Sequence, residues 1–130
     1  MPDGDKLDRS RQLKARSKQF ALRVIRLFDG LPSRDAARVI GRQLLRSATS
    51  VGANYRAACR ARTTKEFAMK MRIVVEEADE TAYWLELLIE AEVMPVRRLS
   101  PLLIEANELL AIFAASLRTV QSRSRISMIR

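Results

Sequence analysis

One segment of the chain, from Arg34 to about Ala61, carries three kinds of surface in a single helical register. At about 100° per residue, six arginines between positions 34 and 60 fall within an arc of about 120°. Apolar side chains gather roughly opposite, as in a helix that packs against others. The pattern predicts a helix of about 28 residues with a basic outer face and a buried apolar face. These six arginines and Arg62, which follows them, form the arginine stripe. Its members are Arg34, Arg38, Arg42, Arg46, Arg56, Arg60 and Arg62.

Small polar side chains separate the stripe from the apolar face. This polar edge consists of Gln43, Ser47, Ser50 and Asn54. Such residues can line a ligand groove, or they can let two helices approach closely and hydrogen-bond across the seam, which fixes the register. We favour the second interpretation. Gly52, next to Ala53, is expected to serve the same close approach.

Apolar residues at helical spacing predict three further helices. The first ends at Gly30 and Pro32, and Ser33 is the expected N-cap of the arginine-rich helix. Thr63 and Glu66 form a capping-box pattern at the start of a third helix. The predicted core faces of the four helices are, in order, Leu13, Phe20, Val24, Leu27 and Leu31; Ala37, Ile40, Leu44, Ala48, Val51, Tyr55 and Ala58; Phe67, Met71, Val74, Ala78, Ala82, Leu85 and Ile89; and Leu102, Ala106, Leu109, Phe113, Leu117 and Val120.

The third helix is expected to run from about Thr64 to Glu92, and the fourth to begin at Ser100-Pro101. The last ten residues are expected to form a loose tail. Long helices with short connections favour antiparallel neighbours, and 48% hydrophobic residues can supply a core for one domain. The predicted fold is all-α, an antiparallel up-and-down four-helix bundle spanning residues 1–130 with its core at about 13–120 and basic, flexible ends.

The arginine-rich helix also carries a family pattern. Gln43-Leu44, Arg46-Ser47-Ala48, Ser50-Val51-Gly52-Ala53-Asn54 and Lys65-Glu66-Phe67 resemble the four-helix bundle proteins known as 23S rRNA intervening-sequence or S23-type proteins, with relatives among the accessory proteins of diversity-generating retroelements. The similarity extends from about Leu13 to Val120. It implies a ring-like homopentamer, with nucleic-acid association suggested for some members. Many members carry Glu-Gly where this chain has Ala57-Ala58, so no role of that glutamate can be transferred.

A second apolar set on the third helix indicates self-association. It consists of Met69, Ile73, Trp84 and Leu87, with Ala91 beyond them, and it lies away from the predicted core face. A bundle helix needs only one buried stripe, so a second one containing the only tryptophan favours a subunit interface. The alternative is that these are scattered surface hydrophobes, which are normal in proteins.

The charge distribution indicates where a polyanion would bind. The formal net charge is +9, yet residues 66–108 are net acidic and both flanking regions are basic. From Arg34 to Arg60 the stripe would span about 39 Å, enough to meet many phosphates. The other interpretation is that the arginines are solubilising or pair with carboxylates of a neighbouring helix or subunit, among Glu76, Glu77, Asp79 and Glu80. No helix-turn-helix signature or aromatic stacking motif is evident.

Catalytic chemistry has little support in this sequence. The chain has no histidine, which excludes Ser-His-Asp and Cys-His sites and the Glu-x-x-His pairs of di-iron bundles. The single cysteine, Cys59, cannot form an intrachain disulfide. We therefore predict a protein that is not an enzyme and has no cofactor and no metal site.

The start of the chain is too polar for a secretory signal, and its apolar runs are much shorter than the ~20 residues of a membrane span. A cytoplasmic protein without membrane contact is expected. The hypothesis that follows is an oligomeric bundle that binds RNA or DNA backbone through the arginine stripe. The alternative is an oligomeric scaffold or adaptor with a protein partner, such as a reverse transcriptase.

Overall fold

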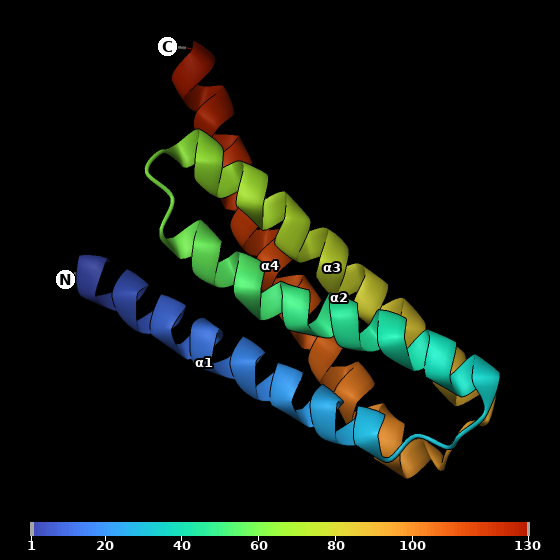
Figure 1. The fold of residues 1–130 in the computed structure, drawn as a ribbon. Helices are drawn as coiled ribbons and strands as arrows, with labels where there is room; N and C mark the ends of the chain where they lie inside the picture. Colours follow the sequence, from blue (N-terminus) through green and yellow to red (C-terminus); the bar gives the residue numbers. More distant parts are fainter. Residues whose placement is uncertain (1, 130) are drawn as a thin grey trace.

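The computed structural model describes residues 2–129, with side chains described for residues 4–126. It contains four helices, α1 (Pro2–Asp29), α2 (Asp35–Cys59), α3 (Thr64–Glu90) and α4 (Val96–Ile129), and no strand within residues 2–129. Consecutive helices run in opposite directions, and α1 also contacts α4, which closes the bundle (Figure 1). The predicted antiparallel four-helix bundle is confirmed.

A continuous apolar core runs through the bundle. Phe20, Leu44, Met71, Leu85 and Phe113 are each almost completely buried, one or more from every helix. The expected core faces are largely confirmed, since most of their residues are buried. The expected core residues that are only partly buried are Leu13, Leu31, Ile40, Phe67, Ile89, Leu117 and Val120. On α3, Leu88 is fully buried although the sequence did not place it in the core, and Ile89 is only partly buried.

The turn between α2 and α3 follows the predicted capping pattern. The Thr63 hydroxyl accepts a hydrogen bond from the Glu66 backbone N–H at 3.1 Å, so Thr63 is the N-cap of α3. The Glu66 carboxylate accepts from the backbone N–H of Arg62 at 2.8 Å, one residue before the usual capping-box partner. These two bonds satisfy donors that a helix N-terminus would otherwise leave free.

The end of α3 is closed by a Schellman motif. The N–H of Val93 donates to the carbonyl of Leu88 at 3.2 Å, and the N–H of Glu92 donates to that of Ile89 at 3.0 Å. Val93 and Leu88 are both buried, which supplies the apolar contact that accompanies this motif. Glu92 occupies the left-handed position, with φ of 54°.

Two expected helix starts were wrong. Arg34, not Ser33, is the N-cap of α2, and it makes no side-chain capping bond. The Ser33 hydroxyl instead accepts from the Arg38 guanidinium at 3.3 Å. Helix α4 begins at Val96, before Ser100, and Pro101 lies within its early turns.

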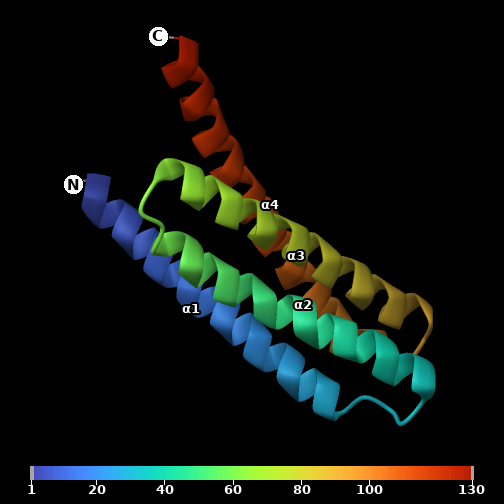
Figure 2. The same cartoon turned by 45° about the horizontal axis from the view of Figure 1, so that its top comes forward.

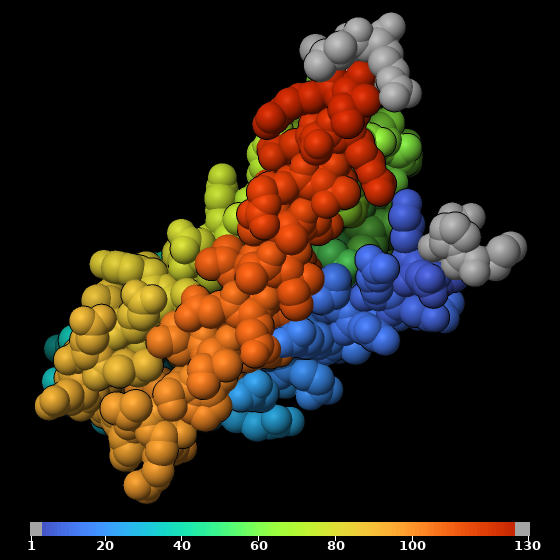
Figure 3. All heavy atoms as spheres, turned by 180° about the vertical axis from the view of Figure 1, so that it is seen from behind, coloured from blue at the N-terminus to red at the C-terminus, as the bar shows by residue number. Residues whose placement is uncertain are grey.

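The expected loose ends are also helical. Helix α4 continues from Gln121 to Ile129, Arg130 lies outside the described residues, and α1 begins at Pro2. The C-terminal end of α4 extends beyond the turn between α2 and α3 (Figures 1 and 2). Viewed from behind, this part of α4 leans away from the N-terminal part of α1, leaving an opening at whose base α2 is visible (Figure 3).

Two glycines of α2 allow α1 to approach closely. A Cβ at Gly41 would lie 3.3 Å from the Phe28 ring of α1 and would collide with the Leu31 side chain just after α1. A Cβ at Gly52 would lie 3.3 Å from the Ser17 hydroxyl oxygen. Ser17 is completely buried. Gly52 therefore serves a close helix approach, as expected, but toward α1 rather than along the polar edge.

By length and apolar composition alone, Val96–Ile126 of α4 could cross a membrane. The buried residues Leu99, Leu109 and Phe113 belong to the bundle core. Core helices of bundles satisfy the same criterion, so one such helix is weak evidence for a membrane span.

Candidate nucleic-acid interface

The arginine stripe lies on the solvent-facing side of α2 and on the turn that follows it. All seven of its residues are exposed. Within residues 4–126, six of them form no ion pair. These six, which we call the free arginines, are Arg34, Arg38, Arg42, Arg56, Arg60 and Arg62.

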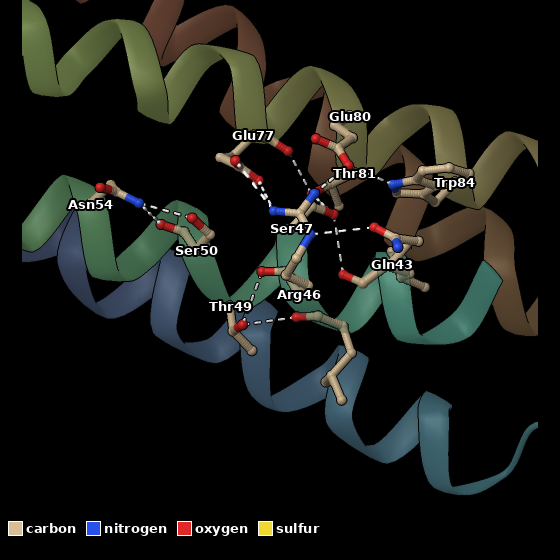
Figure 4. A network of polar contacts seen from close by, with 12 residues as sticks. Gln43, Arg46, Ser47, Thr49, Ser50, Asn54, Glu77, Glu80, Thr81 and Trp84 are labelled. Atoms are coloured by element: carbon tan, nitrogen blue, oxygen red, sulfur yellow. Dashed lines mark hydrogen bonds and ion pairs between the residues drawn. The ribbon is translucent and has the colours of Figure 1, made fainter. Parts of the chain in front are cut away.

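Arg46 differs from the rest of the stripe because it pairs with α3 (Figure 4). Its guanidinium donates to Glu77 at 3.2 Å and also to Glu80, and its Nε donates to the Gln43 side-chain oxygen at 3.3 Å. The Glu80 carboxylate in turn accepts from the indole N–H of Trp84 at 3.1 Å. Arg46 thus joins α2 to α3, and the sequence-based interpretation that some arginines pair with neighbouring carboxylates holds for this one.

The ion pair between Arg46 and Glu80 shifts the pKa of both side chains. Hydrogen bonding to Arg46 and then to Trp84 lowers the pKa of Glu80, and hydrogen bonding to Glu80 raises the pKa of Arg46. The Arg46 side chain is 49% exposed, so solvent screens this attraction and its contribution to stability stays below about 1 kcal/mol. Both groups remain charged at neutral pH, so α3 partly neutralises the stripe at this position.

The polar edge faces α3, and one of its four residues bonds across the seam. The hydroxyl oxygens of Ser47 and Thr81 lie 2.9 Å apart, and both residues are buried. Asn54 instead donates to the hydroxyl and carbonyl oxygens of Ser50 in its own helix, at 2.8 and 2.9 Å (Figure 4). Gln43 is exposed and contacts Arg46. Every buried polar side-chain atom in the described part of the chain has a hydrogen-bond partner.

The predicted interface residues of α3 fall into two groups. Met69 and Ile73 are exposed, at 54% and 36%. Trp84 and Leu87 are only partly exposed. Trp84 packs against the edge of the core and makes an edge-to-face contact with Tyr83, whose ring centroid is 5.2 Å away. The tryptophan therefore has intrachain partners of its own.

The acidic residues of α3 do not gather into a metal site. No group of three or more metal-ligating side chains occurs in the described part of the chain. Glu77 and Glu80 are held by Arg46, while Glu76 and Asp79 face outward beside Tyr83 along the α3–α4 seam.

Comparison with known proteins places this bundle in a family. Residues 9–115 match the model of the 23S rRNA-intervening sequence proteins. The chain belongs to the 23S rRNA-intervening sequence protein family. A similar crystal structure is that of a Bacteroides thetaiotaomicron protein of unknown function from the S23 ribosomal protein family. It is 33% identical with a TM-score of 0.77, and the match covers 84% of this chain and 97% of that one. No curated protein matches the chain.

In this member of the 23S rRNA-intervening sequence protein family, Ala57-Ala58 stands where the sequence resemblance led us to expect Glu-Gly. Ala58 is buried in the core and Ala57 is partly buried. A carboxylate at Ala57 would stand beside the arginine-bearing side of the helix.

Two features of the site were not predicted from the sequence. Tyr83 is 53% exposed on the same side of α3 as Met69. It lies two heptads after Met69, so helical periodicity would have placed them together. The second feature is a triad in which Arg16 of α1 bonds Glu105 and Glu108 of α4, with distances of 2.6 and 2.5 Å. No spacing pattern within one helix identifies this triad, because Arg16 is far from Glu105 and Glu108 in the sequence.

Proposed function

We propose that this protein is a non-enzymatic, homo-oligomeric bundle that binds the phosphate backbone of RNA or DNA through the free arginines of α2. The observation that carries the proposal is the row of exposed guanidinium groups without carboxylate partners among the described side chains. Guanidinium groups bind phosphate oxygens well, because their planar array of donors matches phosphate geometry. The family name, which refers to an intervening sequence of 23S rRNA, is compatible with this proposal.

Helix geometry supports backbone contact rather than base reading. From Arg34 to Arg60 the free arginines extend along one side of α2 over about 39 Å, at ~1.5 Å per residue, with a gap between Arg42 and Arg56 where Arg46 is paired. A rigid row of this length can follow several phosphates. In an oligomer the same row would be repeated on each subunit, which would strengthen the positive field and make binding steeply dependent on salt.

The experiment compares two variants with the same change in charge. In the stripe variant, Arg38, Arg42, Arg56 and Arg60 become Gln. In the control variant, Arg11, Lys18, Arg26 and Arg97, which are exposed outside the stripe, become Gln. Arg46 is left unchanged because it joins α2 to α3. Binding of a fluorescent structured RNA and a matched DNA duplex is measured by anisotropy across a salt series, and oligomer mass by light scattering.

We expect the stripe variant to lose at least about tenfold in affinity at low salt while keeping its oligomer mass. Its salt slope should fall by about 0.7 to 0.9 for each lost phosphate contact. The control variant should bind almost as well as the natural chain. Equal losses in the two variants would mean that net charge, not the stripe, drives binding, and no binding of either probe at low salt would reject the proposal.

The alternative function is an oligomeric scaffold or adaptor with a protein partner. The observation that favours it is the exposed apolar and acidic side of α3, where Met69, Ile73 and Tyr83 lie near Glu76 and Asp79. Retention of a protein partner that survives high salt, without retention of RNA, would support this alternative over the first proposal.

A further inference from the structure

The opening between α1 and α4 is a groove on the opposite side of the bundle from the α2–α3 seam. The two helices are joined by the Arg16–Glu105 ion pair and separate beyond it, toward the N-terminus of α1 and the C-terminus of α4 (Figure 3). Of the four neighbouring helix pairs, α1 and α4 contact each other least. The separation leaves a hollow of about 620 Å³ between them.

The floor of the groove is apolar. It is formed by half-buried side chains from all four helices, among them Leu13 of α1, Cys59 of α2, Phe67 of α3, and Ile112 and Val120 of α4. Leu7 stands at its mouth and is 56% exposed. Because this surface continues the hydrophobic core to solvent, covering it would add buried apolar area to the bundle.

The rim of the groove is basic. Lys6 and Arg9 line it on α1, Arg123 lines it on α4, and Arg62 lines an adjoining hollow that shares Phe67 and Val120. No carboxylate is found among the described residues that line the two hollows. The groove therefore combines an apolar floor with a rim whose charged lining residues are all positive.

We infer that this groove is a docking site for an acidic amphipathic helix of a protein partner. Apolar residues at the i, i+3, i+4 and i+7 positions of such a helix fit an apolar floor between two helices. Its carboxylates would then lie against the basic rim, which is the charge complementarity that selects partners. The docked segment would become a fifth helix that fills the gap between α1 and α4.

The length of the groove fits a short helix. Its lining residues extend from Lys6 to Leu13 on α1, about 10 Å, and from Ile112 to Arg123 on α4, about 16 Å, at ~1.5 Å per residue. This span corresponds to roughly two to three helical turns. The site is separate from the free arginines of α2 except at Arg62.

The test uses the full chain and a fluorescent synthetic peptide of about four turns. The peptide carries leucines along one face and glutamates and alanines elsewhere. A scrambled peptide of the same composition lacks the apolar face, and a third peptide has lysines in place of the glutamates. Binding is followed by anisotropy, and the alkylation rate of Cys59 is measured with and without peptide, because this single cysteine lines the groove.

We expect the amphipathic acidic peptide to bind and to slow Cys59 alkylation, and the other two peptides to bind at least about tenfold more weakly. Leu7→Glu should abolish most of the binding, whereas Ile104→Glu, on the exposed surface of α4 outside the groove, should not. Charge reversal of Lys6 and Arg9 should weaken binding more than the same reversal at Arg11 and Lys18. These residues are all exposed, so each variant is expected to fold.

Several outcomes would overturn the inference. Equal binding of the scrambled peptide, or equal effects of Leu7→Glu and Ile104→Glu, would show that the peptide does not use the groove. A peptide that lowers the oligomer mass would identify the groove as a contact between copies of this chain. Displacement of the peptide by RNA, together with loss of RNA binding on reversal of Lys6 and Arg9, would assign the groove to nucleic acid instead.

Discussion

At the scale of single residues, Glu92 adopts a backbone conformation that glycine usually occupies. Its φ of 54° places it in the left-handed region, at the position after the C-cap of α3. A side chain with a Cβ is disfavoured in that region by about 1–2 kcal/mol, because the Cβ approaches the neighbouring carbonyl oxygen. The two backbone bonds of the Schellman motif and the burial of Val93 hold the turn in place despite this cost.

Glu92→Gly should therefore stabilise the protein by about 0.5–1 kcal/mol, since glycine relieves the steric cost but loses more entropy on folding. Urea denaturation followed by circular dichroism measures the change. Glu86→Gly, at an exposed position inside α3, is the matched control and should destabilise by about 1 kcal/mol. A lower urea midpoint for Glu92→Gly would contradict this explanation of the turn.

Residues whose role depends on local geometry were predictable from the sequence. The Thr63–Glu66 capping pattern and the exposure of the arginine stripe both follow from spacing along one helix. For Arg46, the sequence predicted only that some arginines of the stripe could pair with carboxylates of the third helix. Its choice of Glu77 and Glu80 depends on how α3 lies against α2, which no spacing within α2 determines.

At the scale of helices, the Arg16 triad is the polar contact that joins α1 to α4. Two guanidinium nitrogens of Arg16 donate to the two carboxylate oxygens of Glu105, at 2.6 and 2.8 Å, and one of them also reaches Glu108. Hydrogen bonding to Arg16 lowers the pKa of Glu105, while partial burial acts in the opposite direction. The triad lies next to the groove, whose lining ends at Leu13 on α1 and Ile112 on α4.

The lowered pKa of Glu105 predicts a dependence of stability on pH. A carboxylate whose pKa is lower in the folded state stabilises the fold above its unfolded pKa of about 4.3, and this contribution is lost as the pH falls through the folded value. Glu105→Gln should remove about 1 kcal/mol at pH 7 and flatten the decline of stability below about pH 4.5. Urea denaturation at a series of pH values measures both effects.

Glu86→Gln provides the comparison, because Glu86 is exposed and forms no ion pair among the described side chains. It should leave the stability at pH 7 nearly unchanged. If Glu105→Gln gave the same pH profile as the natural chain, the Arg16 triad would not be a stabilising contact in solution.

Helix existence and order were predictable from the sequence, but several helix ends were not. The apolar spacing from Leu102 to Phe113 identifies α4, yet the helix begins earlier because Leu99 is also fully buried in the core. Ser100-Pro101 matches a helix start locally, but Pro101 lies inside α4, beyond its first turn, where proline removes one hydrogen bond of the helix. Packing of Leu99 thus outweighs the local start signal.

At the scale of the whole molecule, the exposed side of α3 is the surface from which self-association is expected. Met69, Ile73 and Tyr83 present apolar area to solvent in the isolated chain. Met69→Asp with Ile73→Asp should lower the particle mass toward that of a monomer, because desolvating two carboxylates at an apolar contact is unfavourable. Light scattering after size-exclusion chromatography measures the mass.

Ile104→Asp is the control for the oligomer experiment, because Ile104 is 60% exposed on α4. It should keep the mass of the natural chain. An unchanged mass in the α3 variant would place the contact between subunits elsewhere, or leave the chain as a monomer. The exposure of α3 could be foreseen from two apolar stripes on one helix, whereas the groove between α1 and α4 could not, because it depends on where two distant helices separate.

Trp84 also gives the protein an optical probe of its own. It is the only tryptophan in the chain, so all indole emission comes from one place on α3. Its N–H bonds Glu80, which also binds Arg46, so the emission would respond to any loosening of α2 from α3. Its neighbour Tyr83 lies on the exposed side of α3. A partner that covers this side would exclude water near the indole and shift its emission to shorter wavelength, without any added label.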